Sequence, residues 1–374
     1  MEREKDRNIA IDLLRAVAIL AVMADHWVLS GLSAPGSGPW DEVLRRIGGH
    51  GFYGVTLFFV LSGFLITRTT MLRELAFYRL SWRDFYVRRI ARIQPLFLLA
   101  VALGVLMLAF GDRAAPLFAQ VYADPRSSFT VEFWASLFTF TNNWERVFHD
   151  GFWGLHWDVM WSLAVEEQFY LAFPLLVLWA GLRRRLAGAL AAVAVIGLVA
   201  RIAGDALHLG FTAKDMNSFV CFDTLALGCL CALLGEVLPH GRGLARAAIA
   251  AGALLIALAL YRGGVAALIA GALLAVHGAR YADPFSGAVW RGIARIGQLS
   301  YGMYLLHATA LYFAAPILAG LPPLAGFALF AAATYAIAEL SYRAYEAPLN
   351  AWLRARLLPQ GALRPGASLS EAAS

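Results

Sequence analysis

Charged residues are scarce in this chain, and it shows no internal repeat and no low-complexity stretch. They make up 15% of its 374 residues, whereas about 25% is usual for a soluble domain, and 60% of the residues are hydrophobic. This composition excludes an ordinary soluble globular protein. It also excludes a disordered chain, because 13% of the residues are aromatic and disordered segments are poor in aromatic residues. A membrane protein remains.

Cysteine is also scarce, and all three cysteines fall in one apolar run. Cys221, Cys229 and Cys231 therefore fit packing positions, and they do not fit a disulfide framework or a closed zinc site. The net charge of +6 does not indicate nucleic-acid binding, since basic residues in an apolar chain usually mark membrane topology. We expect no metal and no nucleic-acid partner.

The fold class that follows is an all-α integral membrane protein with about ten transmembrane helices. A spanning helix needs about 20 mostly apolar residues. We expect the first run to be retained as a membrane helix, because it holds several charged residues and lacks a convincing cleavage site. The expected runs are 9–30, 52–71, 93–111, 159–180, 187–204, 218–235, 244–260, 264–280, 297–317 and 324–344.

The distribution of basic residues predicts that both termini are cytoplasmic. With that orientation, 22 of the 31 Lys and Arg residues lie on the inside, and Arg15 is the one basic residue assigned to the interior of a span. The prediction is one membrane domain over 1–357, followed by a short tail at 358–374. That tail is too short to fold alone and is expected to be disordered.

The longest predicted outer segment, 112–157, is rich in tryptophan. An interfacial aromatic belt explains this enrichment. A platform for an extracytoplasmic acceptor, such as a sugar, explains it as well, and both interpretations stay open. The residues concerned are Trp134, Trp144, Trp153 and Trp157.

The first run carries the clearest functional candidates, Arg15 and His26. They are eleven positions apart, which on a helix returns to within roughly 20° of one face and separates them by about 16 Å along the axis. Imidazole suits proton removal from a hydroxyl at neutral pH, and guanidinium suits an anion or a carbonyl. Alternatively, Arg15 pairs with Asp12 and His26 only completes a helix interface.

Two candidates follow in the second run and just after it. Ser62-Gly63 could hold a nucleophile, but small residues favour close helix packing, which is the preferred interpretation. Arg88, Arg89 and Arg92 share a helical face that is expected to end at Pro95, at the cytoplasmic boundary. They either anchor lipid head groups or hold the phosphates of a nucleotide-like donor.

Carboxylates and further polar groups enter later runs. Glu166 begins an apolar helix, where it either positions a basic partner or is simply interfacial, and the Ser162 hydroxyl one turn earlier could orient it. Ionisable residues in spanning helices are costly and suggest function. Asp223, Tyr304 and His307 are such residues, and the last two share a face at i,i+3 spacing.

In combination, seven segments resemble the membrane-bound acyltransferase-3 family. The resemblance covers about Asp12 to Pro348, nearly the whole membrane region, with the motifs in the family's order. The segments are DLLRAVAILAVMADHW, GVTLFFVLSGFLITR, FYVRRIARIQPLF, WSLAVEEQFYLAFP, FDTLALGCLCALL, LSYGMYLLHA and YRAYEAPLNAW.

The resemblance implies a ten-helix enzyme of the bacterial cytoplasmic (inner) membrane. Such enzymes move an acyl group, usually acetyl, from cytoplasmic acyl-CoA to a hydroxyl of a surface polysaccharide, a lipid-linked sugar or a macrolide. Acetyl-CoA is then the donor co-substrate. Family members often carry an additional extracytoplasmic SGNH-type domain, which we do not find here, so we expect direct transfer or hand-over to a partner.

The resemblance also assigns roles by position. Arg15 and His26 match the family's essential pair, with His26 as general base and Arg15 holding the donor or stabilising charge. The matches elsewhere are Arg88, Arg89 and Arg92 for acyl-CoA binding, Ser162 with Glu166, His307, and Glu346 with Pro348.

A transporter or flippase without catalysis is the alternative function, because polytopic bundles with buried charges also form transport pathways. The absence of repeat symmetry weighs against it. A covalent acyl-histidine is a mechanistic variant of the enzyme hypothesis.

Overall fold

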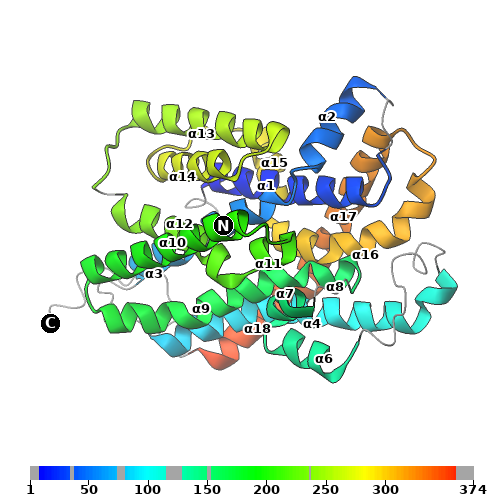
Figure 1. Cartoon of the computed structure of the whole chain (residues 1–374), viewed down its shortest axis with the longest axis horizontal. Helices are drawn as coiled ribbons and strands as arrows, with labels where there is room; N and C mark the ends of the chain where they lie inside the picture. Colours follow the sequence, from blue (N-terminus) through cyan, green and yellow to red (C-terminus); the bar gives the residue numbers. More distant parts are fainter. Residues whose placement is uncertain are drawn as a thin grey trace.

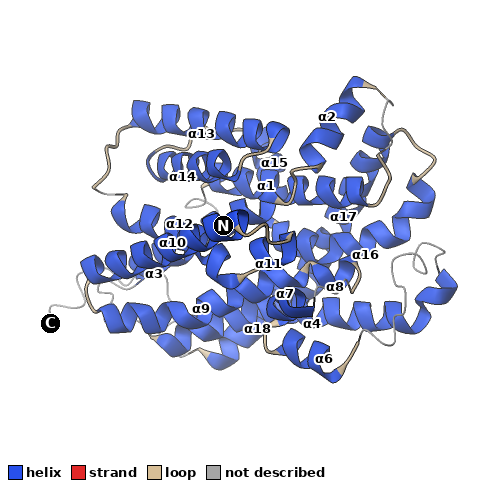
Figure 2. Ribbon diagram, viewed as in Figure 1, coloured by secondary structure: helices blue, strands red, loops and turns tan. Residues whose placement is uncertain are grey.

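The computed structural model describes residues 8–33, 38–73, 81–114, 129–149, 153–235 and 237–358. Within these residues every regular element is a helix, and no strand is found (Figure 2). The long helices run side by side along the longest axis of the molecule (Figure 1). The predicted tail lies outside the described residues, apart from Leu358.

All ten apolar runs coincide with helices. These are α1 (Ile9–Leu29), α3 (Tyr53–Arg73), α4 (Trp82–Ala114), α9 (Met160–Ala180), α10 (Arg183–Ala206), α12 (Ser218–Leu234), α13 (Arg242–Arg262), α14 (Val265–Tyr281), α16 (Ser300–Leu318) and α17 (Pro323–Ser341).

Shorter helices connect the long ones. They are α2 (Pro39–Gly48), α6 (Val131–Phe138), α7 (Asn142–His149), α8 (Leu155–Asp158), α11 (Phe211–Asp215), α15 (Ala288–Gln298), the π-helix η3 (Tyr342–Glu346) and α18 (Ala347–Leu357).

Seven helical segments in the described residues are long and apolar enough to cross a membrane, by length and composition. The apolar helices α12 and α14 are shorter, at 17 residues each, and α1 carries Asp12, Arg15 and Asp25. Only 22% of the apolar window of α10 is buried, so most of its surface faces outward. An apolar outer face of this size suits a lipid environment. The all-helical class is confirmed, and ten crossings stay a prediction.

Small residues allow the helices to approach closely. A Cβ on Gly63 of α3 would lie 1.9 Å from the carbonyl oxygen of Leu225, and one on Gly228 of α12 would lie 2.1 Å from that of Val60. The packing interpretation is therefore confirmed for Gly63, since backbone-to-backbone contact at α3 and α12 leaves no room for a side chain.

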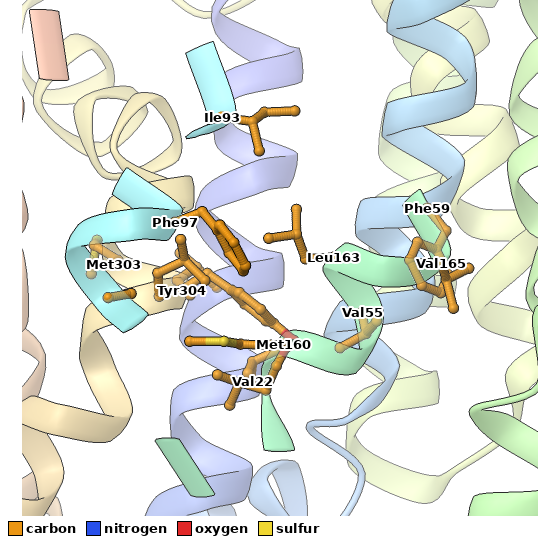
Figure 3. Close-up of a cluster of buried hydrophobic side chains, with 14 of the residues drawn as sticks. Val22, Val55, Phe59, Ile93, Phe97, Met160, Leu163, Val165, Met303 and Tyr304 are labelled. Carbon is orange, nitrogen blue, oxygen red and sulfur yellow. Dashed lines mark hydrogen bonds between the residues drawn. The ribbon is translucent and has the colours of Figure 1, made fainter. Parts of the chain in front are cut away.

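The largest cluster of buried side chains joins α1, α3, α4, α9 and α16. Figure 3 shows Val22 and Met160 together, with Phe97 and Tyr304 close by and Phe59 beside Val165. This apolar cluster surrounds the polar groups described below, so the surrounding packing holds them in place.

Helix α4 differs from the expectation that the basic face ends at Pro95. The helix continues through this proline from Trp82 to Ala114. Proline cannot donate the usual backbone hydrogen bond, but neighbouring helices often stabilise such positions in membrane proteins. At the same position the Tyr345 hydroxyl donates to the Pro95 carbonyl at 3.1 Å, which connects α4 to η3.

Two of the four tryptophans in this segment lie in the interior and therefore fit neither an interfacial belt nor an acceptor platform. Trp153 and Trp157 are buried, at 5% and 2% exposure. Phe133 and Trp134 pack against Trp157, so these rings form an aromatic core under α6 and α8. Trp144 instead stacks on Phe148. Residues 115–128 and 150–152 lie outside the described part.

The three cysteines are free and buried, as predicted.

Candidate active site

Two histidines from different helices form the centre of the site. His26 lies in the last turn of α1, and its Nδ1 is 2.7 Å from Nε2 of His307 on α16. The rings are nearly coplanar and meet edge to edge, with centroids 4.9 Å apart and an interplanar angle of 6°. His307 is fully buried, whereas the His26 side chain is 15% exposed. The exposed edge of the pair therefore belongs to His26.

The hydrogen-bond partners determine the tautomer of each ring. His307 Nδ1 lies 2.6 Å from the Tyr304 carbonyl oxygen and 3.2 Å from that of Met303. A carbonyl only accepts, so Nδ1 of His307 carries the proton and its Nε2 is the acceptor in the neutral ring. His26 must then donate from Nδ1. We infer from these partners that Nε2 of neutral His26 holds the free lone pair.

Asp25 lies next to this free nitrogen and was not among the predicted site residues. Its Oδ2 is 3.8 Å from Nε2 of His26. The backbone N–H of Phe52 donates to the same carboxylate. Asp25 is buried, with 9% exposure. A charge on the His26 ring would therefore be stabilised by a neighbouring carboxylate.

A third buried histidine, His156 of α8, lies against α16 two residues beyond His307. Its Nδ1 is 2.8 Å from the Thr309 hydroxyl, and its Nε2 is 2.9 Å from the Ala100 carbonyl oxygen. The sequence reasoning missed His156 because it lies in the segment that was interpreted only through its tryptophans.

Arg15 and His26 do share a helical face, and that face packs on α16. Arg15 Nε donates to the Ser300 hydroxyl at 3.2 Å, two turns before His307. Serine and histidine at 300 and 307 are seven residues apart on one side of α16. The spacing argument for α1 is thus confirmed by the partners on the opposite helix.

Glu166 is held by hydroxyl groups, but not by the one predicted. Ser62 Oγ donates to Oε1 of Glu166 at 2.6 Å. Tyr170 donates to Ser62 at 2.8 Å and lies 3.4 Å from Oε2 of Glu166. Ser162, one turn before Glu166, instead bonds to the Tyr304 hydroxyl at 2.7 Å. The expectation that Ser162 orients Glu166 is wrong, because its hydroxyl faces α16.

Tyr304 is correspondingly tied to the start of α9. Its hydroxyl donates to the Val159 carbonyl at 2.9 Å. The ring lies 5.8 Å from that of His307, centroid to centroid. Tyr304 and Ser162 therefore connect α9 to the helix that carries the second histidine.

Part of the basic run of α4 turns toward Glu166. The charges of Arg15, Arg89 and Arg92 act on its carboxylate. The Arg89 guanidinium lies 3.0 Å from the centroid of the Tyr170 ring, and its Nε makes no hydrogen bond although it is buried. Arg92 is exposed and also acts on Glu346. Arg88 is half-buried.

The other predicted residues lie around this centre. Gln298 donates to Asp12 Oδ2 at 3.1 Å, at the junction of α1 and α15. Ser341 donates to Glu346 at 3.0 Å, within the π-helical turn that joins α17 to α18. Such turns are frequent at functional sites. Asp12 and Glu346 thus stabilise junctions between helices.

Asp223 belongs to a separate cluster. Arg201 Nη2 and Nε bind its carboxylate at 3.0–3.2 Å. Arg201 was counted among the outside residues, but it lies within α10 and is 13% exposed. Arg15 is therefore not the lone arginine inside a predicted span. Asp223 on α12 neutralises the Arg201 guanidinium, and this pairing allows Arg201 to lie inside the bundle.

The arrangement brings a base and a charged cluster into one bundle. Nε2 of His26 can accept a proton from a hydroxyl, while Arg15, Arg89 and Arg92 provide positive charge deeper in the bundle. In the part of the chain that the structure describes, no group of three or more His, Cys, Asp or Glu side chains is placed to hold a metal ion.

Comparison with known proteins identifies relatives over the same region. The family model described as "Acyltransferase domain" matches residues 8–343. A putative peptidoglycan O-acetyltransferase YrhL of Bacillus subtilis (strain 168) is 29% identical over 91% of this chain and 54% of its own length. Peptidoglycan O-acetyltransferase OatA of Listeria monocytogenes is 29% identical over 91% of this chain and 55% of its own.

O-acetyltransferase OatA of Staphylococcus aureus (strain NCTC 8325) is 25% identical over 91% of this chain and 57% of its own length. The chain thus spans little more than half the length of these relatives. No solved structure matches it significantly.

Proposed function

The chain belongs to this acyltransferase family, and from that premise we propose that it is a membrane O-acyltransferase that uses acyl-CoA, with His26 as the general base. The acyl group is acetyl, as in the names of the relatives. The acceptor is a hydroxyl of a sugar-containing molecule, since two of those names specify peptidoglycan.

One observation carries the proposal, namely the hydrogen bond between His26 and His307. Because His307 keeps the proton of His26 on Nδ1, the lone pair of Nε2 is available to a substrate hydroxyl. A positioned histidine base contributes about 10²–10⁴-fold to rate. His307 is a positioning residue in this mechanism.

The proposed step transfers the acyl group from the CoA sulfur to the acceptor oxygen. Nε2 of His26 removes the hydroxyl proton as the acceptor oxygen attacks the thioester carbonyl carbon. The C–S bond then breaks, and the CoA sulfur takes the proton from His26. The products are an O-acyl ester and free CoA thiol, and the Asp25 carboxylate stabilises the protonated imidazole between the two proton transfers.

The donor enters, in this proposal, from the end of the bundle at which α4 begins. Arg89 and Arg92 bind the phosphates of CoA, because guanidinium groups suit phosphate oxygens. Arg88 lies on the same helix and is a further candidate. Arg15 lies between this end and His26, where it holds the thioester or stabilises developing negative charge.

The proposed topology has both termini in the cytoplasm and all ten apolar helices crossing the cytoplasmic membrane of a bacterium. This orientation places Arg89 and Arg92 at the cytoplasmic side, where acyl-CoA is present, and His26 near the opposite side. It also follows from the excess of basic residues in the segments assigned to the inside.

The direct test is transfer of labelled acetyl from acetyl-CoA to a cell-envelope fraction, followed together with release of CoA thiol. Purified wild-type protein should do both, and His26→Ala should lose both while unfolding at the wild-type temperature. His149→Ala is the matched control, because this histidine is 66% exposed and pairs with Glu145 on its own helix. A transporter would release no thiol, and retained transfer by His26→Ala would overturn the assignment.

A covalent acyl-histidine can be tested in the same assay. Acid quenching before acceptor is added would leave label on the protein if Nε2 attacks the thioester itself. General-base catalysis leaves the protein unlabelled, and that is the expected result.

A further inference from the structure

An apolar groove bounded by α1, α15, α16 and α17 opens on the outside of the bundle. It holds about 240 Å³ of free space, whereas an apolar cavity of about 150 Å³ is already large enough to bind benzene. Apart from one tyrosine, its lining residues are Leu, Ile, Met, Ala and Gly. Those used below are Leu20, Gly292, Ile296, Met303, Ala331 and Tyr335.

Small residues leave this space open on the side that faces away from the bundle. A Cβ added to Gly292 of α15 would have no atom within 4 Å. The surface of α17 beside the groove is apolar, with Leu329, Ile337 and Leu340 exposed. Only 22% of the apolar window in the helical segment Pro323–Leu357 is buried. An apolar space of this kind does not retain water, so the groove suits a lipid chain.

One end of the groove carries positive charge. Tyr335 and Glu339 are one turn apart on α17, and the two oxygens of Glu339 accept hydrogen bonds at 2.9 Å from Arg295 of α15. Arg343 donates to the same carboxylate at 2.5 Å. Arg291 is exposed one turn before Arg295 on α15. Three guanidinium groups thus accompany one carboxylate, so this end of the groove favours an anionic group.

Exposed aromatic rings lie at the same end. Trp290 is 40% exposed and Tyr342 is 38% exposed, and the Arg295 guanidinium lies 4.9 Å from the centroid of the Tyr342 ring. Trp and Tyr concentrate at the level where lipid head groups meet the apolar core of a membrane, and basic residues there attract anionic lipids. From its interior to this end, the site therefore follows the order of groups in a phospholipid.

We propose that this groove binds one acyl chain of an anionic phospholipid, with the lipid phosphate held by Arg291 and Arg343. The positive charge favours an anionic head group over a zwitterionic one. The groove is too small for a helix of another protein, whose diameter with side chains is about 10–12 Å. The inference goes beyond the proposed function and does not depend on acetyl transfer.

The bound chain lies, in this proposal, against the part of α16 that holds His307. The Met303 side chain lines the groove, while its backbone carbonyl accepts from Nδ1 of His307 at 3.2 Å. Met303 also adjoins Tyr304, the residue that connects α16 to α9 (Figure 3). A lipid in the groove therefore fills space behind this turn and should stabilise the folded bundle.

The first test compares Gly292→Trp, which fills the groove, with Gly188→Trp. Gly188 of α10 is a matched control, because its added Cβ would also have no atom within 4 Å and it does not line the groove. Protein in a neutral detergent is titrated with phosphatidylglycerol, and bound lipid is followed by native mass spectrometry. Gly292→Trp should weaken the tightest binding about tenfold, and Gly188→Trp should not.

Thermal unfolding is the control for folding. Without added lipid, Gly292→Trp should unfold at the wild-type temperature, and with phosphatidylglycerol it should gain less stability than the wild-type protein. Equal binding and equal stabilisation of the two tryptophan variants would overturn the proposed site.

A second test concerns the head group. Arg291→Gln should weaken binding of phosphatidylglycerol about fivefold and leave that of phosphatidylcholine unchanged. Arg184→Gln should change neither, because Arg184 is an exposed arginine at the start of α10, outside the groove. Glycerol 3-phosphate, which has the phosphate but no chain, should not stabilise the protein. If it stabilises the protein as well as phosphatidylglycerol does, the groove is not the binding site.

A third test locates the chain. Phosphatidylglycerol with a diazirine at the end of one acyl chain should label peptides of α15, α16 or α17, and excess unlabelled lipid should suppress this labelling. The same pattern of label in the wild-type protein and in Gly292→Trp would contradict the proposal. All three tests can be made on protein that transfers no acetyl, so a failure of the proposed function is distinguishable from a failure of this inference.

Discussion

His26 Nδ1 and His307 Nε2 lie 2.7 Å apart, and the remaining nitrogen of His307 is held by the backbone carbonyls of Met303 and Tyr304. The direction of the hydrogen bond is therefore set by α16, which carries His307. A single helix thus determines which nitrogen of His26 can act as a base.

The first prediction concerns His307. Replacing it by Leu removes the acceptor for His26 Nδ1, so both tautomers of His26 become available and kcat for acetyl transfer should fall at least tenfold. His307→Asn keeps an acceptor oxygen and should recover part of the rate. KM for acetyl-CoA should be unchanged in both variants, and steady-state kinetics of labelled transfer measures both constants.

Equal activity of the Leu and Asn variants would show that His307 acts only through packing. Thermal unfolding of both proteins serves as the control for that possibility.

The helices could be predicted because a bilayer requires long apolar runs, and such runs can be identified directly in the amino-acid sequence. The shared face of Arg15 and His26 was also predictable, since helical periodicity alone determines it. The expected partner of Glu166 was wrong because spacing within one helix cannot reveal a hydroxyl on another. Ser62 lies 104 residues away from Glu166 and had been interpreted as a packing residue.

Arg201 shows a second limit of sequence reasoning. A residue near the end of an apolar run can be assigned to the outside or to the span, and the count of basic residues assigned Arg201 to the outside. Only the packing of α10 against α12 brings Asp223 to the guanidinium and makes an arginine within α10 acceptable.

The second prediction concerns the Ser62 hydroxyl, which donates to Glu166. Ser62→Ala removes the donor at 2.6 Å from a largely enclosed carboxyl group. Leaving such a group without its partner costs about 1–3 kcal/mol of stability, so the unfolding temperature should fall. Thr69→Ala, also on α3, is the control, because Thr69 is exposed and bonds to its own helix at the Leu65 carbonyl. A similar decrease for both variants would contradict a specific role for Ser62.

The third prediction concerns donor binding by α4. Arg89→Ala and Arg92→Ala should each raise KM for acetyl-CoA about tenfold, since one charge-assisted hydrogen bond contributes about 1.5–3 kcal/mol. Arg83→Ala should leave KM unchanged, because Arg83 is exposed one to two turns earlier on the same helix. KM of the wild-type protein should also rise with ionic strength, because salt screens the attraction between guanidinium and phosphate.

Tyr170 offers a sharper version of this test. Tyr170→Phe keeps the ring beneath the Arg89 guanidinium and removes only the hydroxyl that bonds to Ser62. It should therefore bind CoA as the wild-type protein does, whereas Tyr170→Leu should bind it more weakly. Equal CoA affinity for the two variants in calorimetry would show that the ring does not position Arg89.

The last prediction concerns the junction that supports α1. Gly297 of α15 leaves no room for a side chain, because a Cβ there would lie 1.8 Å from the Asp12 carbonyl oxygen. Gly297→Ala should force α15 away from α1 and lower stability by about 1–3 kcal/mol or more. Gly292→Ala, on the same helix with no atom within 4 Å of the new Cβ, should instead stabilise the protein by about 0.4–1 kcal/mol. Thermal unfolding in detergent distinguishes the two.

Because Asp12 precedes Arg15 by one turn on α1, Gly297→Ala should also reduce acetyl transfer, and Gly292→Ala should not. If both variants unfold at the wild-type temperature, the close contact between α15 and α1 does not occur in the protein.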